Sequence, residues 1–340
     1  MILSKKPQNC VLVTGAGGFI GSALCKTLNV DGHSVRKVFR ELNGDRGLNN
    51  IAIGNIDSYT DWSGALNGVD TVVHCAARVH QMRECVTDPL SEYIKVNVEA
   101  TIKLAEQTIE AGVETFIYIS SIKAAHDDSD PYGESKIRSE EALVKIFSGS
   151  AVKLIIIRPP LVYGGGVRGN FLSLMKLVSL GFPLPFKAVA NKRSMVYIEN
   201  LVDLLRYCII CAHVPSGVYE VADGAGISTR ALINLLAEEF DRYAQNDNRS
   251  RFTHAKMVSK LRRGVFLGMK LPPTFYFPLP ILGCVMKLLG KEGQFLRLTE
   301  SLEVDPFYER RVPGWSPPFL MREGISRTAI SFFANLSNTQ

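Results

Sequence analysis

Residues 14–21 read TGAGGFIG. The apolar run at residues 10–13 predicts a short buried strand that leads into this stretch, and residues 19–29 predict a helix that leaves it. A glycine-rich turn between a strand and a helix is typical of the first βαβ unit of a nucleotide-binding sheet. We therefore expect an α/β protein with a Rossmann-type, doubly wound parallel sheet.

The glycines of this stretch have separate tasks in such a turn. Gly15 permits the tight turn, Gly18 lets the backbone approach a pyrophosphate, and Gly21 permits close packing of helix on strand. Phe19 and Ile20 open the helix, whose free N–H groups and dipole attract anions. The sequence therefore predicts that a dinucleotide binds here.

Further apolar runs alternate with helical patterns through the first half of the chain, at residues 33–39, 50–55, 70–77, 114–121 and 152–159. Alternating strands and helices imply parallel pairing with right-handed crossovers. After Pro159 the chain becomes rich in Pro, Gly and irregular segments. We expect a Rossmann domain at residues 8–158 and a smaller mixed α/β, mainly substrate-binding domain at residues 159–335 over the C-terminal edge of the sheet, with some helices and strands returning to that sheet.

Composition narrows the class of protein. The chain is 46% hydrophobic and 21% charged, with a net charge of +6, and it carries no nucleic-acid-binding motif. Its 7 cysteines form no paired framework and no secretory signal follows Met1, which indicates a cytoplasmic protein. Cys208 and Cys211 lie in an apolar run without partner ligands, so we expect no metal site.

One apolar segment, Thr274 to Gly290, raises the question of membrane contact. It contains prolines and is shorter than the ~20 apolar residues that a bilayer span needs, so we favour a buried helix. The basic stretch from Arg249 to Gly264 lies just upstream. A peripheral contact with anionic lipid is the alternative.

The end of the second predicted strand indicates which dinucleotide binds. An acidic residue there would bond the ribose 2′-hydroxyl of NAD, whereas an arginine accommodates the 2′-phosphate of NADP. The chain reads RKVFRELN, with Arg40 where the acid would be and Glu41 directly after it. We favour NADP(H) over NAD(H); the alternative is that Glu41 serves NAD.

The stretch DPYGESK places Tyr132 one helical turn before Lys136. By itself this spacing is common between surface neighbours. Ser121 ends the fifth predicted strand, at the sheet edge where doubly wound proteins bind ligands.

The order of motifs along the chain resembles the extended short-chain dehydrogenase/reductase family, in the branch that modifies nucleotide sugars. These motifs are TGAGGFIG, HCAA at 74–77, Asn97 in VNVEAT, ISS at 119–121, YGESK at 132–136, RPPLVYG at 158–164 and RSMVYIENLVD from Arg193. They cover nearly the whole chain. Their joint order is more specific for the fold and family than for the reaction.

The resemblance implies a catalytic triad of Ser121, Tyr132 and Lys136. Tyr132 would exchange a proton with a sugar hydroxyl or carbonyl while nicotinamide exchanges hydride with the carbon. A free phenol has a pKa of about 10, so we expect the Lys136 ammonium to lower the pKa of Tyr132. Lys136 would also bond the nicotinamide ribose, and Ser121 would bond the reacting oxygen.

The resemblance also implies further binding residues. Around the cofactor they are Asn55, Ile56, Ala76, Ala77, Asn97 and Pro159, in addition to the glycine loop and Arg40. Around the diphosphate of a UDP-sugar they are Asn170, Arg193 and Arg297.

Two positions depart from the family pattern. The 4,6-dehydratases of the family carry an Asp–Glu pair directly after their Ser or Thr, where this chain has Ile122 and Lys123. Neither residue can serve as a carboxylate acid or base, so dehydration is disfavoured. Asn55 stands where relatives often have an Asp near the adenine.

The resemblance therefore implies hydride transfer at carbon 4 of a UDP-sugar used for bacterial surface polysaccharide (O-antigen). We slightly favour reduction of a UDP-4-keto-6-deoxy-N-acetylhexosamine over a UDP-glucose or UDP-N-acetylglucosamine 4-epimerase. An epimerase for a lipid-linked sugar and a non-catalytic cofactor-binding protein stay open. Family members lead us to expect a homodimer.

Overall fold

The computed structural model describes residues 9–42, 47, 49–79, 88–125, 130–246, 273–304 and 311–337. The chain divides into two compact units. The first comprises Met1–Pro160, Glu199–Val221 and Phe307–Pro317, and the second comprises Leu161–Ile198, Ala222–Pro306 and Pro318–Gln340. Two segments from the second half of the chain therefore belong to the first unit.

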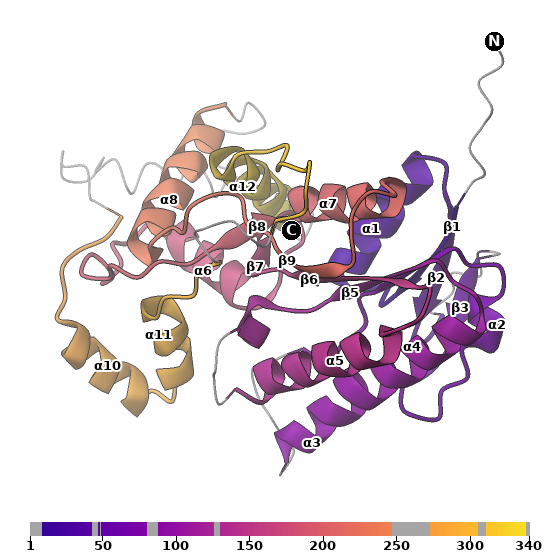
Figure 1. Ribbon diagram of the computed structural model, residues 1–340. Helices are drawn as coiled ribbons and strands as arrows, with labels where there is room; N and C mark the ends of the chain where they lie inside the picture. The colour runs from indigo at the N-terminus through magenta and orange to yellow at the C-terminus, as the bar shows by residue number, and fades with distance from the viewer. Residues whose placement is uncertain are drawn as a thin grey trace. The chain divides into compact units, whose positions relative to one another are not determined.

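A parallel sheet forms the centre of the first unit (Figure 1). Its strands are β1 (Cys10–Thr14), β2 (Ser34–Phe39), β3 (Asn50–Ala52), β4 (Thr71–His74), β5 (Thr115–Ile119), β6 (Lys153–Arg158) and β9 (Gly217–Glu220). They lie in the order β3-β2-β1-β4-β5-β6-β9, and every neighbouring pair is parallel. The predicted doubly wound sheet is confirmed; its edge strand β9 is one that the sequence analysis did not locate.

Helices cover both faces of this sheet. The helices of the first unit are α1 (Phe19–Val30), α2 (Ser63–Leu66), α3 (Pro89–Tyr93), α4 (Ala100–Glu110), α5 (Pro131–Phe147) and α7 (Ile198–Ile210), with a π-helical turn η1 (Ile94–Glu99) and a 3₁₀ turn η2 (Ile122–Ala125). Helices α1 and α7 lie on one face, and α3, α4 and α5 on the other (Figure 1). Because both faces are covered, strand residues such as Val72, Phe116 and Ile156 are fully buried.

The second unit is mainly helical, and its sheet has only two strands among the described residues. It contains the parallel pair β7 (Leu161–Tyr163) and β8 (Met195–Tyr197) and the helices α6 (Gly169–Ser179), α8 (Thr229–Asn246), α10 (Leu279–Leu288), α11 (Glu292–Thr299) and α12 (Met321–Ser337). Phe240 of α8 stacks on Phe332 of α12 at 5.6 Å and meets Phe333 edge-on at 4.9 Å. The basic stretch at residues 249–264, for which lipid contact was the alternative prediction, lies outside the described residues.

A buried ion pair fastens α5 to the sheet. The Glu140 carboxylate on α5 accepts bonds from Arg158 of β6, with Nη2–Oε2 at 2.6 Å and Nε–Oε1 at 3.0 Å. It also accepts from the Ser120 hydroxyl, and Glu220 of β9 lies 3.9 Å from Arg158. Since both partners are almost fully buried, removing one would leave an uncompensated charge in the core.

Glu140→Ala is therefore expected to lower the free energy of unfolding by about 3–5 kcal/mol. Glu134→Ala is the matched control, because it removes an exposed pair with Arg138 on the same helix. The control should change the free energy of unfolding by less than about 0.5 kcal/mol. Urea unfolding of both variants measures the difference, and equal effects would contradict the stabilising role of the buried pair.

Candidate active site

The predicted site residues of the first unit follow neighbouring strands at one edge of the sheet. The glycine loop follows β1, Arg40 follows β2, Ala76 follows β4, Ser121 follows β5, and Pro159 follows β6. The strand order reverses between β1 and β4. In doubly wound sheets this crevice at the carboxyl ends of the strands is where nucleotides bind.

The glycine loop is compressed against the end of β4. Gly15 has a left-handed φ of 64°, and a Cβ there would lie 2.8 Å from the Ala76 nitrogen. A Cβ on Gly21 would overlap the Gly15 carbonyl oxygen. Gly18 is the N-cap of α1 and no side chain caps the helix there. The residues thus fit a dinucleotide diphosphate, because backbone N–H groups at an uncapped helix N-terminus attract an anion.

A buried histidine ties this loop to its neighbours. The Ala76 N–H donates to the Thr14 hydroxyl oxygen at 3.1 Å, and that hydroxyl lies 2.7 Å from His74 Nδ1. The Thr101 hydroxyl donates to the Asn97 carbonyl at 2.6 Å, so it accepts from His74 Nε2 at 3.0 Å. Burial lowers the pKa of His74 to about 3, which keeps the ring neutral with its proton on Nε2.

Asn97, expected beside the cofactor, is a positioning residue in the structure. Its Oδ1 accepts from the Arg78 N–H at 2.8 Å, and its Nδ2 donates to the Arg78 carbonyl at 3.0 Å and to the Ser135 hydroxyl at 3.0 Å. The amide thus holds the segment after β4 against the first turns of α5.

Arg40 and Asn55 are both exposed, and Ile56 packs against the core cluster of the sheet. The neighbouring Arg36 is committed elsewhere, because its Nη1 donates to the carbonyls of Ala65 and Asn67 at 2.6 and 2.8 Å. Of the basic residues near the end of β2, Arg40 therefore keeps the accessible position expected for a contact with a 2′-phosphate.

Ser121 and Tyr132 meet beyond the end of β5. The Ser121 side chain lies close enough to the phenol of Tyr132 to lower its pKa, and the Ser121 hydroxyl oxygen accepts from the Lys123 N–H at 3.2 Å. Ser120, in contrast, is buried and bonded to Glu140. The two adjacent serines thus have different partners, and Ser121 is the one that contacts the phenol.

The pKa of Tyr132 is raised above its ordinary value, mainly because burial disfavours the phenolate. The Ser121 hydroxyl lowers this pKa, whereas electrostatic interactions with Asp130 and with the Tyr93 phenol raise it further. We expected Lys136 to lower the pKa of Tyr132, and this expectation is wrong: Lys136 is not among the protein groups that lower that pKa. Burial outweighs a nearby cation, and the Lys136 ammonium is bonded elsewhere.

Lys136 is only 1% exposed and packs against Tyr118 of β5. Its Nζ donates to the Ile119 carbonyl at 2.8 Å and to the Tyr118 hydroxyl at 3.1 Å, and lies 4.5 Å from the centre of the Tyr118 ring. Burial lowers the pKa of Lys136 to about 7, against the opposing effects of Glu140 and Cys75.

Three further residues shape the site without a signal in the family motifs. Tyr118 binds Lys136, and Tyr93 places its ring 6.0 Å from that of Tyr132. Asp130 caps α5 by accepting from the Tyr132 N–H at 3.4 Å, and it forms an ion pair with Lys123. Only Asp130 had a local signal, since an Asp–Pro pair commonly opens a helix.

Arg193 and Arg297 come together in the second unit. Arg193 Nη1 donates to the Arg297 carbonyl at 2.6 Å and to the Glu300 carbonyl at 3.2 Å, at the C-terminal end of α11. Burial lowers the pKa of Arg193; the charge of Glu300 opposes this effect, and the charge of Arg297 adds to it. Asn170 lies on a different element, as the second residue of α6.

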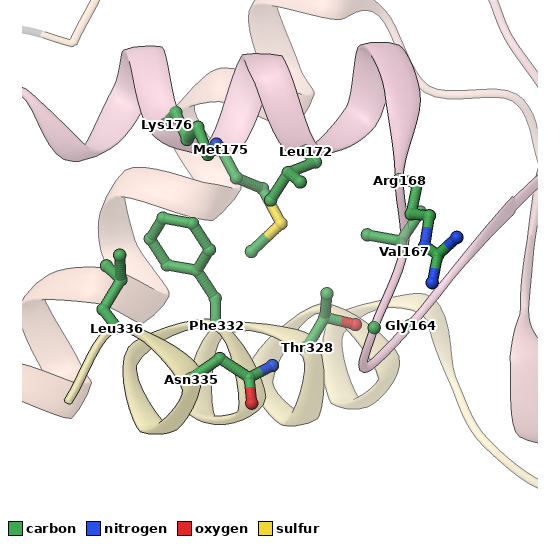
Figure 2. A pocket seen from close by; sticks show the side chains of 11 residues that line it. Gly164, Val167, Arg168, Leu172, Met175, Lys176, Thr328, Phe332, Asn335 and Leu336 are labelled. Carbon is green, nitrogen blue, oxygen red and sulfur yellow. The ribbon is translucent and has the colours of Figure 1, made fainter. Parts of the chain in front are cut away.

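The second unit also holds a cavity of about 300 Å³ between α6 and α12 (Figure 2). Leu172, Met175 and Phe332 supply an apolar lining, and Arg168 and Lys176 contribute basic groups. The residues that line this cavity do not include Asn170, Arg193 or Arg297. It is therefore separate from the residues predicted to bind the sugar diphosphate.

The sheet order and the glycine loop at its reversal point define a Rossmann-type α/β protein. Residues 11–222 match the family described as NAD dependent epimerase/dehydratase family. The chain belongs to this family of NAD-dependent enzymes, and the resemblance drawn from the motifs is confirmed.

Relatives of the chain extend over almost its whole length. It is 36% identical to a UDP-glucose 4-epimerase of Vibrio cholerae, covering 96% of this chain and 97% of that protein. It is 29% identical to the N-acetyl-alpha-D-glucosaminyl-diphospho-ditrans,octacis-undecaprenol 4-epimerase of Escherichia coli O157:H7, covering 94% and 93%.

Solved structures share the fold at lower identity. MoeE5 in complex with UDP-glucose and NAD matches with a TM-score of 0.66 and 22% identity, covering 96% of this chain and 100% of that chain. The UDP-N-acetylglucosamine 4-epimerase of Bacillus cereus matches with a TM-score of 0.64 and 16% identity, covering 95% and 99%.

The pKa of Lys136 can be checked by NMR of the protein with ¹³C-labelled lysines. One lysine resonance should titrate near pH 7, and Lys136→Met should remove it. Above that pH the folded chain holds Lys136 neutral, while the unfolded chain keeps it charged up to about pH 10.4. The contribution of Lys136 to the free energy of unfolding should therefore rise with pH across this interval. A Lys136 resonance that titrates only above about pH 9 would contradict the assigned burial effect.

Proposed function

We propose that this protein is a UDP-sugar 4-epimerase that removes and restores hydrogen at carbon 4 with a nicotinamide dinucleotide. The observation that carries the proposal is the grouping of Ser121, Tyr132 and buried Lys136 at the carboxyl ends of the strands, where the glycine loop leads into α1. The full-length similarity to a UDP-glucose 4-epimerase supports epimerisation over other reactions of the family.

The chain's own residues have distinct tasks in this proposal. The glycine loop and the first turn of α1 would hold the diphosphate of the dinucleotide, with Ala76 and Ala77 against it. A bound dinucleotide supplies the hydride carrier and, when oxidised, a positive charge. Tyr132 takes the proton of the carbon-4 hydroxyl in its phenolate form and returns it as a phenol, and Ser121 orients the reacting oxygen.

The second unit would supply the contacts to the sugar nucleotide. Arg193 and Arg297 place two positive groups near one another, which is suited to a diphosphate. An anion there would offset the burial that now lowers the pKa of Arg193. Asn170 is proposed to meet the same diphosphate from α6.

A 4-keto-sugar reductase that uses NADPH is the second candidate, with a UDP-4-keto-6-deoxy-N-acetylhexosamine as substrate. Two observations favour it. Arg40 is exposed at the end of β2, where a 2′-phosphate would lie. The raised pKa of Tyr132 favours the protonated phenol, which is the acid that carbonyl reduction needs.

The homodimer expected from the family resemblance stays a prediction.

The nucleotide carried by the purified protein distinguishes the two reactions. An epimerase regenerates its cofactor in each turnover, so denaturation should release NAD in a near-equal molar amount. A reductase exchanges its cofactor, so protein without bound nucleotide that oxidises NADPH with a 4-keto sugar would favour the second candidate. If the protein releases no NAD, does not oxidise NADPH with a 4-keto sugar and turns over no UDP-hexose, both reactions are excluded.

Tyr132→Phe should lower turnover by about 10²–10⁴-fold, because the proton-transferring group is lost while the site keeps its shape. Binding of the dinucleotide, followed by fluorescence of its reduced form, should be unchanged. Tyr207→Phe is the control, since that phenol bonds the Pro313 carbonyl at 3.2 Å and belongs to no predicted site. Near-normal activity of Tyr132→Phe would remove Tyr132 from the proposed role.

A further inference from the structure

Helix α10 presents an apolar face outward. Ile281, Cys284, Val285 and Leu288 follow one another at helical spacing, and all four are exposed. A helix on the surface of a protein normally places polar side chains on its outer face. The sequence-based expectation of a buried helix is therefore wrong for this face.

The opposite face of α10 is already packed. Leu282 is buried, and Gly283 lies so close to α11 that a Cβ there would be 3.2 Å from a ring carbon of Phe295. Helices α10 and α11 lie side by side, with α10 at the lower left of Figure 1. The outward residues are thus additional to those that hold the helix in place.

Neighbouring residues extend the apolar area beyond the helix. Tyr276 is 69% exposed before it, Leu288 is 87% exposed near its end, and Leu289 is 62% exposed just after it. With Phe275, Ile281 and Val285 these residues form what we call the α10 surface. Several large exposed apolar residues gathered on one short segment are characteristic of an interaction site.

Two lysines and one glutamate border the α10 surface, which leaves a net positive charge beside it. The helix contains no acidic residue, and Lys287 and Lys291 flank Leu288 and Leu289 as exposed side chains. Glu292 lies 3.5 Å from Lys287, with both groups in solvent. Exposed aliphatic and aromatic side chains bordered by lysines are the features of a helix that lies in the interface of an anionic membrane.

We propose that the α10 surface docks onto an anionic phospholipid bilayer, with the helix lying in the plane of the interface. The contact is peripheral, because among the described helices none is long and apolar enough to cross a membrane. The amphipathic ring of Tyr276 suits the headgroup level.

Sedimentation with lipid vesicles tests the proposal without any use of catalysis, so its outcome is independent of the proposed reaction. Vesicles of equal parts phosphatidylglycerol and phosphatidylcholine should bind the protein more tightly than phosphatidylcholine alone. The double variant Ile281→Glu/Leu288→Glu should weaken binding at least tenfold, and Leu288→Glu alone should weaken it measurably. An environment-sensitive fluorophore on Cys284, with Cys284→Ser as control, should shift to the blue with anionic vesicles.

The matched control is Leu320→Glu/Ile330→Glu, which changes two residues of similar exposure in the same unit. It should bind vesicles as the parent protein does, and thermal unfolding should show that both double variants are folded. Absence of binding to anionic vesicles, equal binding to both lipid compositions, or equal loss in both variants would overturn the proposal. Self-association that the Ile281/Leu288 variant abolishes would also overturn it, by assigning the α10 surface to a second copy.

Discussion

The backbone of Gly15 lies against the backbone of Ala76, with no room for a side chain between them. This approach brings together the ends of β1 and β4, the two adjacent strands from which the sheet winds in opposite directions. The Thr14 hydroxyl reinforces it by contacting both Ala76 and His74. The start of α1 and the segment after β4 are consequently positioned by the same contact, on which the whole nucleotide crevice depends.

The second constraint is electrostatic. The protein places a half-buried phenol and a buried amine at the edge of the sheet, and loss of solvent moves both toward their neutral forms. A neutral pair is the least costly arrangement in a dry pocket. In the proposed reaction the phenolate form of Tyr132 would therefore depend on charges that ligands bring, so that proton transfer would be coupled to binding. Asp130 and Lys123 pair with each other, which limits the effect of that carboxylate on the phenol.

The sequence predicts this structure best where the determinants are local. The glycine loop, the apolar strands and the start of α5 after Asp130 each follow from a few consecutive residues. Tyr118 and Tyr93 could not be assigned to the site in this way, because their contacts with Lys136 and Tyr132 depend on how strands and helices pack. The direction of the Tyr132 pKa was mispredicted for the same reason: helical spacing gives the distance of a cation but not the loss of solvent.

Helix α10 is a second case in which the sequence does not determine how a helix packs. Its residues at 281, 285 and 288 and those at 279, 282 and 286 are all apolar, so the pattern marks no single inner face. Packing against α11 uses only one of these stripes. The prolines of this segment and its shortness argued against a membrane span, and burial was therefore the favoured prediction. A helix with two apolar stripes can use two apolar environments: packing against α11 supplies one, and the lipid surface that we propose would supply the other.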